Sequence, residues 1–288
     1  QELPPLDAEP VFQAGHGGVA LSAYDFTSQE NIRLRLFVAH RAGLEPAELE
    51  LVVLNAFDDE GWSDFLAAMQ VGFGAELAGY DLPPVDSQAF EQERKMFESF
   101  KWGMAYVAPR GIGPTEWNRD EKKRIQIRRR FMLLGQTLDG MRVWDVRRAA
   151  QALRSLKGVG DVPLWMQGER EMSGIVLYAS LFEPNVARLD LWHLKDSHRH
   201  GPTFLNVLRI LDVPQAVAVA AEPVDVHAEA RLADRAVRVD AEELLGLVGV
   251  VEVVLVGRDE LRPEALRAPC AEVEDAADAV PPAQRVAP

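Results

Sequence analysis

A segment near the middle of the chain has the pattern of a buried strand that turns sharply into a helix. Residues 162–177 read VPLWMQGEREMSGIVL: an apolar run, a glycine, a charged stretch and the small residues of a closely packed helix start. Similar apolar runs at 49–57, 103–108 and 186–194 alternate with helical patterns. Such short runs are typical of strands buried on both faces of a parallel sheet. The sequence therefore predicts an α/β fold, a doubly wound, mostly parallel sheet with helices on both faces and these runs as neighbouring strands.

The rest of the chain supplies further elements of this sheet and its cover. Alternating residues at 19–40 predict a hairpin around Asn31, and apolar positions at helical spacing predict an amphipathic helix at 141–156 with Trp144 buried. Further expectations are a helix capped by Ser63 or Asp64, a polar surface connection at 75–99, a solvated charged face at 121–130, and final strands at 223–230 and 248–257.

Composition divides the chain into three regions. Residues 1–18 begin with a proline- and acid-rich stretch and are predicted to form a lead-in segment. Residues 19–257 carry the alternating pattern and form the predicted domain. Residues 258–288 are rich in Ala, Pro and acidic residues and lack aromatic residues, which is typical of a disordered tail.

Charge and cysteine content limit the classes of partner. The net charge of −14 disfavours nucleic acid and anionic membrane surfaces, because both require a basic footprint. No apolar run approaches the roughly 20 residues that span a bilayer. Cys270 is the one cysteine, so no internal disulfide can form, and no Cys/His spacing resembles a zinc site. The start at Gln1 suits either signal-peptide cleavage or a segment of a longer product, and of these we favour export to the periplasm or the extracellular space.

The charged turn has the spacing of a nucleophile elbow without its serine. In a Gly-x-Ser-x-Gly elbow, the serine sits on a tight turn and the next backbone N–H serves the oxyanion hole. Gly168 aligns with the first glycine, Arg170 with the nucleophile and Met172 with the last glycine. A guanidinium is always protonated and cannot attack a carbonyl. We expect Arg170 to form ion pairs with its flanking glutamates that lock the turn.

Three segments together carry a resemblance to a known family. They are GMAYVAPRGIG at 103–113, LLGQTLDGMRVWDVRRAAQALRSL at 133–156, and the elbow QGEREMSG. In this order they resemble the acetyl xylan esterase and cephalosporin-deacetylase-like branch of the α/β-hydrolases, over roughly residues 19–257. The helix motif of that branch is matched by Arg142, Val143, Trp144 and Asp145.

The resemblance implies where an oxyanion hole would form. One donor would be the N–H of Glu171, and another would come from the loop after 49–57, around Asp58 and Asp59. Carboxylates at these positions oppose a developing oxyanion, since such a site requires donors or positive charge. The elbow and both oxyanion positions therefore depart from the pattern of an active enzyme in the same direction.

The resemblance also implies a base after the final strand. His227 is the last histidine and precedes the run at 248–257, so the base position is empty if that run is the final strand. Alternatively, 223–230 is the final strand, with His227 as base and Asp190 or Asp196 as its orienting acid. Ser173 is then the nucleophile, if the elbow is shifted by three residues. Its neighbours carry side chains where a sharp turn favours glycine, so a small residue for helix packing is the simpler interpretation.

A histidine-rich segment suggests a metal site. His193, His198 and His200 lie close in sequence to Asp190 and Asp196. Strand alternation places Asp190 and His193 on opposite faces, so the pattern alone does not make these ligands converge. Histidines that cap the following helix are the simpler interpretation, and we expect no metal and no cofactor.

Two further patterns contain residue types that can form sites. Glu169, Glu171 and Glu183 could supply the paired carboxylates of a glycosidase, but the turn would point the first two apart. His16 lies in a glycine-rich run that lacks the strand and helix context of a phosphate loop, so a flexible turn is expected.

Three functional hypotheses follow. The leading one is a catalytically degenerate esterase-like domain, a non-catalytic binding or assembly part of a larger or exported protein. The second is an active carboxylic-ester hydrolase with a triad rearranged around Ser173 and His227. The third is a structural subunit whose acidic surface mediates packing. The leading hypothesis implies another protein domain or subunit as partner.

Overall fold

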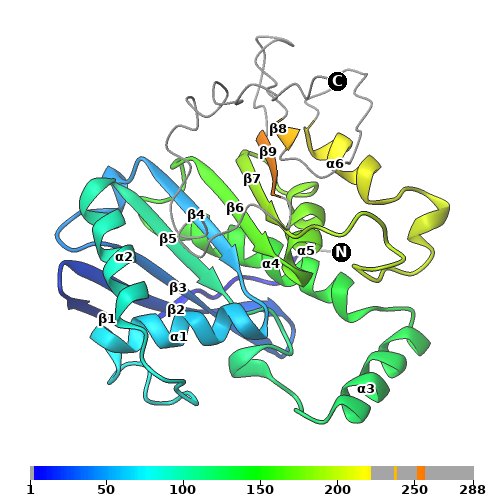
Figure 1. Ribbon diagram of the computed structural model, residues 1–288, viewed down its shortest axis with the longest axis horizontal. Helices are drawn as coiled ribbons and strands as arrows, with labels where there is room; N and C mark the ends of the chain where they lie inside the picture. Colours follow the sequence, from blue (N-terminus) through cyan, green and yellow to red (C-terminus); the bar gives the residue numbers. More distant parts are fainter. Residues whose placement is uncertain (1–2, 222–236, 239–251, 257–288) are drawn as a thin grey trace, which may run out of the picture.

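The protein folds around one mixed β-sheet (Figure 1). This computed structural model describes residues 3–221, 237–238 and 252–256. The described strands are β1 (Glu9–His16), β2 (Val19–Gln29), β3 (Ile32–Arg41), β4 (Leu51–Ala56), β5 (Trp102–Val107), β6 (Leu164–Glu169), β7 (Val186–Trp192), β8 (Val237–Arg238) and β9 (Glu252–Val256). Their order in the sheet is β1-β2-β3-β5-β4-β6-β7-β9-β8.

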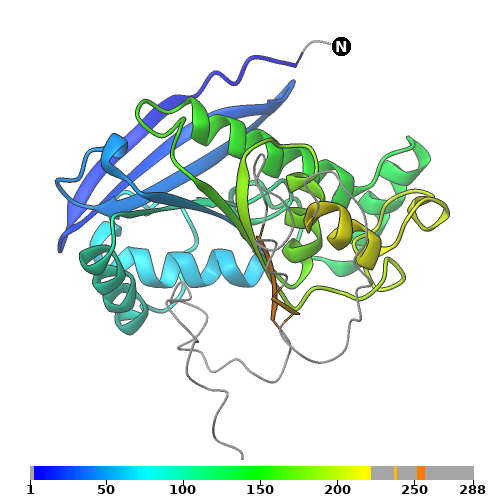
Figure 2. The same cartoon turned by 90° about the horizontal axis from the view of Figure 1, so that it is seen from above.

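Helices cover both faces of this sheet. They are α1 (Asp59–Phe73), α2 (Ser87–Ser99), α3 (Glu121–Leu133), α4 (Leu138–Ser155), α5 (Glu171–Ser180) and α6 (Val213–Ala221), with short 3-10 turns η1 (Pro46–Glu48), η2 (Gly113–Thr115) and η3 (Val207–Arg209). Helices α1 and α2 lie on one face, and α4 and α5 lie on the other (Figure 2). The predicted doubly wound α/β class is confirmed.

The four apolar runs form the centre of the sheet, as expected. Strand β4 pairs in parallel with both β5 and β6, and β6 pairs in parallel with β7. Because the carboxyl ends of parallel strands meet at one edge, the loops after β4, β5, β6 and β7 come together there. This edge positions every residue of the candidate site.

Helix α1 begins earlier than its sequence suggested. The N-cap is Asp58, whose Oδ1 accepts a hydrogen bond from the Gly61 N–H at 2.8 Å. The predicted caps, Ser63 and Asp64, lie inside the helix instead. The strand ends at Ala56, and any of several polar residues in the following stretch could satisfy the free N–H groups; the one nearest the strand does so.

The amino-terminal hairpin forms as predicted, but the segment before it also contains a strand. Strands β2 and β3 pair antiparallel, and Asn31 takes the left-handed conformation (φ 65°) that the predicted turn requires. Part of the expected lead-in segment, 1–18, is the edge strand β1, which pairs antiparallel with β2. Its side chains are mostly exposed, and backbone bonds to β2 hold it in place, so composition gave no sign of it.

The helix carrying the Arg-Val-Trp-Asp motif is α4, as predicted. Trp144 is half-buried, so the expectation of a buried side chain was wrong in degree. Its indole Nε1–H donates to the backbone carbonyl of Ser28 at 2.8 Å, and Arg147 lies over the ring. The indole is held at the rim of the core because its N–H needs an acceptor, which the end of β2 supplies.

Two polar stretches fold as helices with different surroundings. The expected surface connection at 75–99 contains α2, which buries Phe90 and Phe97 against the core. The charged stretch at 121–130 lies in α3, which buries none of its side chains and projects from the body of the molecule (Figure 1). The prediction of a solvated face is confirmed for α3.

Several sequence predictions concern residues outside the described ranges. These are the strand at 223–230, the tail at 258–288, and the residues His227 and Cys270. The run at 248–257 contains β9, which pairs in parallel with β7. None of the helices in the described part of the chain is long and apolar enough to cross a bilayer.

Candidate functional site

The turn between β6 and α5 has the geometry of an elbow. Arg170 stands at its tip with φ 52° and ψ −113°, a conformation that costs a side-chain-bearing residue of order 1–3 kcal/mol. A Cβ on Gly168 would lie 2.6 Å from the carbonyl oxygen of Met172, so only glycine fits there. The turn is therefore tight, and Arg170 rather than a serine stands at its tip.

The Arg170 side chain is held by carboxylates. Its Nε lies 2.7 Å from Oδ2 of Asp58, and its Nη2 lies 2.8 Å from Oδ1 of the same residue. Nη1 donates to the carboxylate of Glu169, and Glu60 lies 3.4 Å from Nε. Hydrogen bonding to Asp58 raises the pKa of Arg170 above its ordinary value. Of the two expected ion pairs with flanking glutamates, only the one with Glu169 forms, and Asp58 takes the place of Glu171.

This ion pair joins two loops at the carboxyl edge of the sheet. Asp58 belongs to the loop after β4 and caps α1, whereas Arg170 belongs to the loop after β6. The resemblance assigned both loops to an oxyanion hole, where donors must face an open position. Here the Arg170 guanidinium and the Asp58 carboxylate bind each other, so the guanidinium donors that face Asp58 are not open to a ligand. Asp59, the neighbouring acid, pairs with Arg124 at 3.0 Å.

Glu171, the other acid assigned to the oxyanion region, faces a buried cation. Its Oε2 lies 3.4 Å from Nη1 of Arg142, whose side chain is only 1% exposed. The Nε–H of Arg142 also donates to the Arg110 carbonyl at 3.3 Å. Burial lowers the pKa of Arg142, partly offset by the negative charges of Asp139 and Glu171. The Arg142 guanidinium is therefore removed from water, and nearby negative charges offset only part of the cost of burying its charge.

The structure gives each described member of the alternative triad a different partner. Ser173 is fully buried in α5, and its hydroxyl donates to the Arg170 carbonyl at 2.7 Å. Asp190 accepts from Nε of Arg188 at 2.7 Å. Asp196 lies 3.0 Å from Nδ1 of His200 at the surface. His227 lies outside the described residues.

The three clustered histidines are not brought together as metal ligands. His198 is buried with Nε2 at 2.6 Å from the Tyr178 hydroxyl and Nδ1 at 2.6 Å from the Pro202 carbonyl. A carbonyl only accepts, so Nδ1 carries the proton and Nε2 accepts from the phenol. Burial raises the pKa of Tyr178 to about 12, which keeps that phenol protonated. His193 lies 3.4 Å from Glu169, and His200 pairs with Asp196.

No group of three His, Cys, Asp or Glu side chains in the described ranges could hold a metal ion. The three candidate glutamates are also dispersed. Glu169 contacts Arg170, Glu171 contacts Arg142, and Glu183 accepts from Arg147 Nε at 2.8 Å. Burial raises the pKa of Glu169, against the opposing effect of Arg170.

His16, from the glycine-rich run, ends β1 and packs near Phe73 and Phe90. The glycines that follow it, Gly17 and Gly18, both have positive φ and form the turn to β2. The run is therefore a strand-to-strand turn, in agreement with its sequence context.

A second ion pair behind the site went unnoticed in the sequence. Asp145 of α4 accepts from Arg110 through its N–H at 2.9 Å, its Nε at 2.8 Å and its Nη2 at 2.6 Å. The Ser28 hydroxyl donates to the same carboxylate. Both partners lie in segments that carry the family resemblance, and that co-occurrence was the available signal. The pair fixes the loop after β5 to α4.

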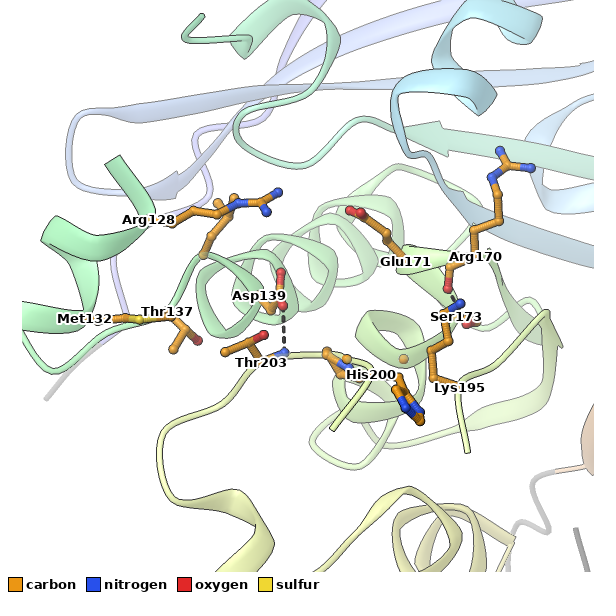
Figure 3. Close-up of a pocket in the computed structure, with 14 residues that line it drawn as sticks. Arg128, Met132, Thr137, Asp139, Arg170, Glu171, Ser173, Lys195, His200 and Thr203 are labelled. Carbon is orange, nitrogen blue, oxygen red and sulfur yellow. Dashed lines mark hydrogen bonds between the residues drawn. The ribbon is translucent and has the colours of Figure 1, made fainter. Parts of the chain in front are cut away.

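A pocket of about 200 Å³ opens beside the elbow (Figure 3). Arg128 of α3 and Lys195 of the loop after β7 line it, together with Asp139, Glu171 and His200. Neither Arg128 nor Lys195 was singled out from the sequence. Arg128 belongs to a stretch that resembles any solvated helix face, and Lys195 reaches the pocket only through the tertiary fold.

The architecture is shared with solved esterase structures. A Bacteroides fragilis protein assigned as an acetyl xylan esterase matches with a TM-score of 0.51 and 10% sequence identity, over 75% of this chain and 60% of its own. The fold is that of the α/β-hydrolases. This confirms the resemblance at the level of the fold. The chain spans less than two thirds of that relative's length.

Two further structures extend the comparison. Acetyl xylan esterase 1 from a Thermoanaerobacterium species has a TM-score of 0.44 and 13% identity, over 68% of this chain and 56% of its own. A glucuronoyl esterase from Solibacter usitatus has a TM-score of 0.44 and 14% identity, over 66% and 52%. No protein-family model matches the sequence, and no curated protein is significantly similar to it. A shared fold does not establish a shared activity.

Proposed function

We propose that this chain is a catalytically degenerate α/β-hydrolase domain that acts by binding or assembly within a larger or exported protein. The observation that carries the proposal is the ion pair between Arg170 and Asp58. Arg170 occupies the elbow tip, where covalent ester hydrolysis requires a nucleophile with an adjacent base. Its guanidinium is bound to the loop that would complete the oxyanion hole.

Two losses support this proposal independently. The first is chemical, because a guanidinium cannot attack an ester carbonyl. The second is electrostatic, because the acids Asp58 and Glu169 pair with Arg170 at the elbow tip and the acid Glu171 follows it in sequence, whereas a developing negative charge requires donors or cations there. Loss of a single oxyanion donor lowers turnover by about 100- to 1000-fold in a working hydrolase. Carboxylates in place of donors would oppose the reaction further.

The alternative nucleophile is poorly placed for attack. The hydroxyl of Ser173 is fully buried and donates to the Arg170 carbonyl within the first turn of α5. A serine nucleophile needs a base to receive its proton, and this proton is held by a backbone oxygen. Ser173 instead supports the strained turn above it. Burial at this position also agrees with a small residue that lets α5 pack against the sheet.

Labelling with an alkyl fluorophosphonate tests the proposal, because this probe reacts only with an activated serine. We expect no label on the native protein under conditions that saturate an active serine hydrolase. Label that is lost in Ser173→Ala and retained in the matched control Ser180→Ala would overturn the proposal. That outcome would establish the rearranged triad.

A further inference from the structure

The pocket beside the elbow concentrates positive charge in an acidic protein. The chain carries a net charge of −14, yet Arg128 and Lys195 both line this small pocket. They come from α3 and from the loop after β7, which are far apart in sequence (Figure 3). His200, from the same loop as Lys195, adds a group that is cationic when protonated.

The acids of the pocket, Asp139 and Glu171, form no ion pair with these two cations, and the cations Arg128, Arg170 and Lys195 outnumber them. The Asp139 carboxylate accepts from the Thr203 N–H at 2.7 Å, as Figure 3 shows. Glu171 is paired with Arg142, and His200 with Asp196. Within the described ranges, Arg128 and Lys195 form no ion pair although both are half-buried. Half-buried cations without a counter-charge favour an anion in the space between them.

A third cation lies next to this pocket. Arg142 and Arg128 both line an adjoining hollow, and the positive charge of Arg128 lowers the pKa of Arg142 in addition to the larger effect of burial. Two guanidinium groups that repel each other at the edge of a pocket are stabilised by a shared anion. In the described part of the chain, Glu171 forms an ion pair with Arg142 at 3.4 Å, and the negative charge of Asp139 acts on Arg142 from further away.

We infer that this pocket binds a small organic anion through its carboxylate or phosphate groups, with Arg128 and Lys195 as the cations that attract it. The inference rests on the proposed function, because it gives the ligand class for a binding role. The volume of about 200 Å³ suits a compact anionic group rather than a whole oligomer. The threonines Thr137 and Thr203 line the same pocket and offer hydroxyl groups to the rest of the ligand.

Isothermal titration with succinate and with inorganic phosphate, at constant ionic strength, tests the inference. We expect saturable binding of at least one anion and no binding of succinamide, the neutral counterpart of succinate. Binding of succinate alone assigns a carboxylate ligand, and binding of phosphate alone assigns a phosphorylated one. Absence of binding by both anions up to about 10 mM, a free energy weaker than about −3 kcal/mol, would overturn the inference.

Charge-neutral variants identify the site. Arg128→Gln and Lys195→Gln should each weaken binding by about tenfold or more, because each removes one charge-assisted contact. The controls Arg129→Ala, exposed on the same helix, and Arg199→Ala, exposed on the same loop, should bind as the native protein does. Equal affinity in all four variants would show an adventitious ion only, and would overturn the inference.

The two proposals fail separately. Serine-dependent hydrolysis with anion binding intact would refute the degenerate-hydrolase function and leave the ligand class standing for an active enzyme. Absence of both hydrolysis and anion binding would refute this inference alone.

Discussion

Two arginine–aspartate pairs hold the loops at the carboxyl edge of the sheet, and they differ in their surroundings. The side chains of Arg110 and Asp145 are 6% and 0% exposed. Those of Arg170 and Asp58 are 31% and 13% exposed. Both pairs are bidentate, and each joins a loop after one strand to a helix or its cap.

The two pairs therefore have different roles: the buried pair supports the fold, and the more exposed pair lies in the candidate site. The Asp145 carboxylate is fully satisfied by Arg110 and Ser28 and lies in segments that carry the family resemblance. The Arg170 guanidinium stands at a strained elbow among more carboxylates than it can neutralise. The buried pair fixes the loop after β5 to α4, whereas the more exposed pair lies at the elbow where we propose that a catalytic serine is absent.

Breaking the buried pair should have the largest effect on stability. Asp145→Asn leaves the Arg110 guanidinium buried without its counter-charge, so the free energy of unfolding should fall by about 3 to 5 kcal/mol. Urea denaturation measures this change. The control Asp81→Asn breaks an exposed pair with Arg119 and should leave the urea midpoint almost unchanged. If Asp145→Asn changed the free energy of unfolding as little as Asp81→Asn does, the buried pair would not stabilise the fold as we propose.

Trp144→Ala should have the next largest effect. The indole is half-buried and donates to Ser28, which also contacts Asp145. We expect a loss of about 2 to 3 kcal/mol, below the range for a fully buried tryptophan. Trp144→Phe should retain most of the packing and lose about 1 kcal/mol for the hydrogen bond. An unchanged urea midpoint for Trp144→Ala would show that this side chain does not support the buried pair.

Substitutions of Arg170 at the elbow tip should have smaller effects on stability. They remove an ion pair, which destabilises the fold, and a glycine also relieves backbone strain, which stabilises it. Arg170→Ala removes a partly exposed ion pair and should lower stability by about 1 kcal/mol. Arg170→Gly also relieves the strain at φ 52°, so it should be more stable than the alanine variant by about 1 kcal/mol. Thermal unfolding of the two variants compares them directly. If alanine proved as stable as glycine, the elbow would not store strain.

The smallest expected effect is a pH dependence at Glu169. Burial raises the pKa of Glu169, so the folded protein retains the proton after the unfolded chain has lost it. Stability from this group is therefore lost as pH rises from the ordinary glutamate pKa through the raised one. Glu169→Gln should gain stability relative to the native protein as pH rises above the ordinary glutamate pKa. A relative loss over this range would show that pairing with Arg170 outweighs burial.

The sequence revealed the sheet because its central strands are buried on both faces, which leaves short apolar runs such as 49–57 and 162–167. It missed β1 because an exposed edge strand is held by backbone bonds rather than by side chains. The place of Arg170 at the elbow tip could be predicted because the elbow is formed by one short, continuous segment of the sequence. The pairing of Arg170 with Asp58 could not be predicted, because that contact joins loops from different strands.

The pocket was equally hidden from the sequence. Arg128 lies in a basic stretch whose residues look equivalent, and only the fold places this one beside Lys195. The buried network of Arg110, Asp145 and Ser28 depends on three segments that meet only in the folded chain. Sequence patterns report burial and local turns well, whereas polar contacts between distant segments require the topology.

Hydrolysis of p-nitrophenyl acetate tests the central claim most directly. We expect the native protein to show no turnover above a denatured control, and Ser173→Ala to change nothing. Arg170→Ser alone should not restore activity, because a serine hydroxyl without a base is a weak nucleophile. Turnover by the native protein that is abolished by Ser173→Ala or His227→Ala would contradict the account and establish an active, rearranged hydrolase.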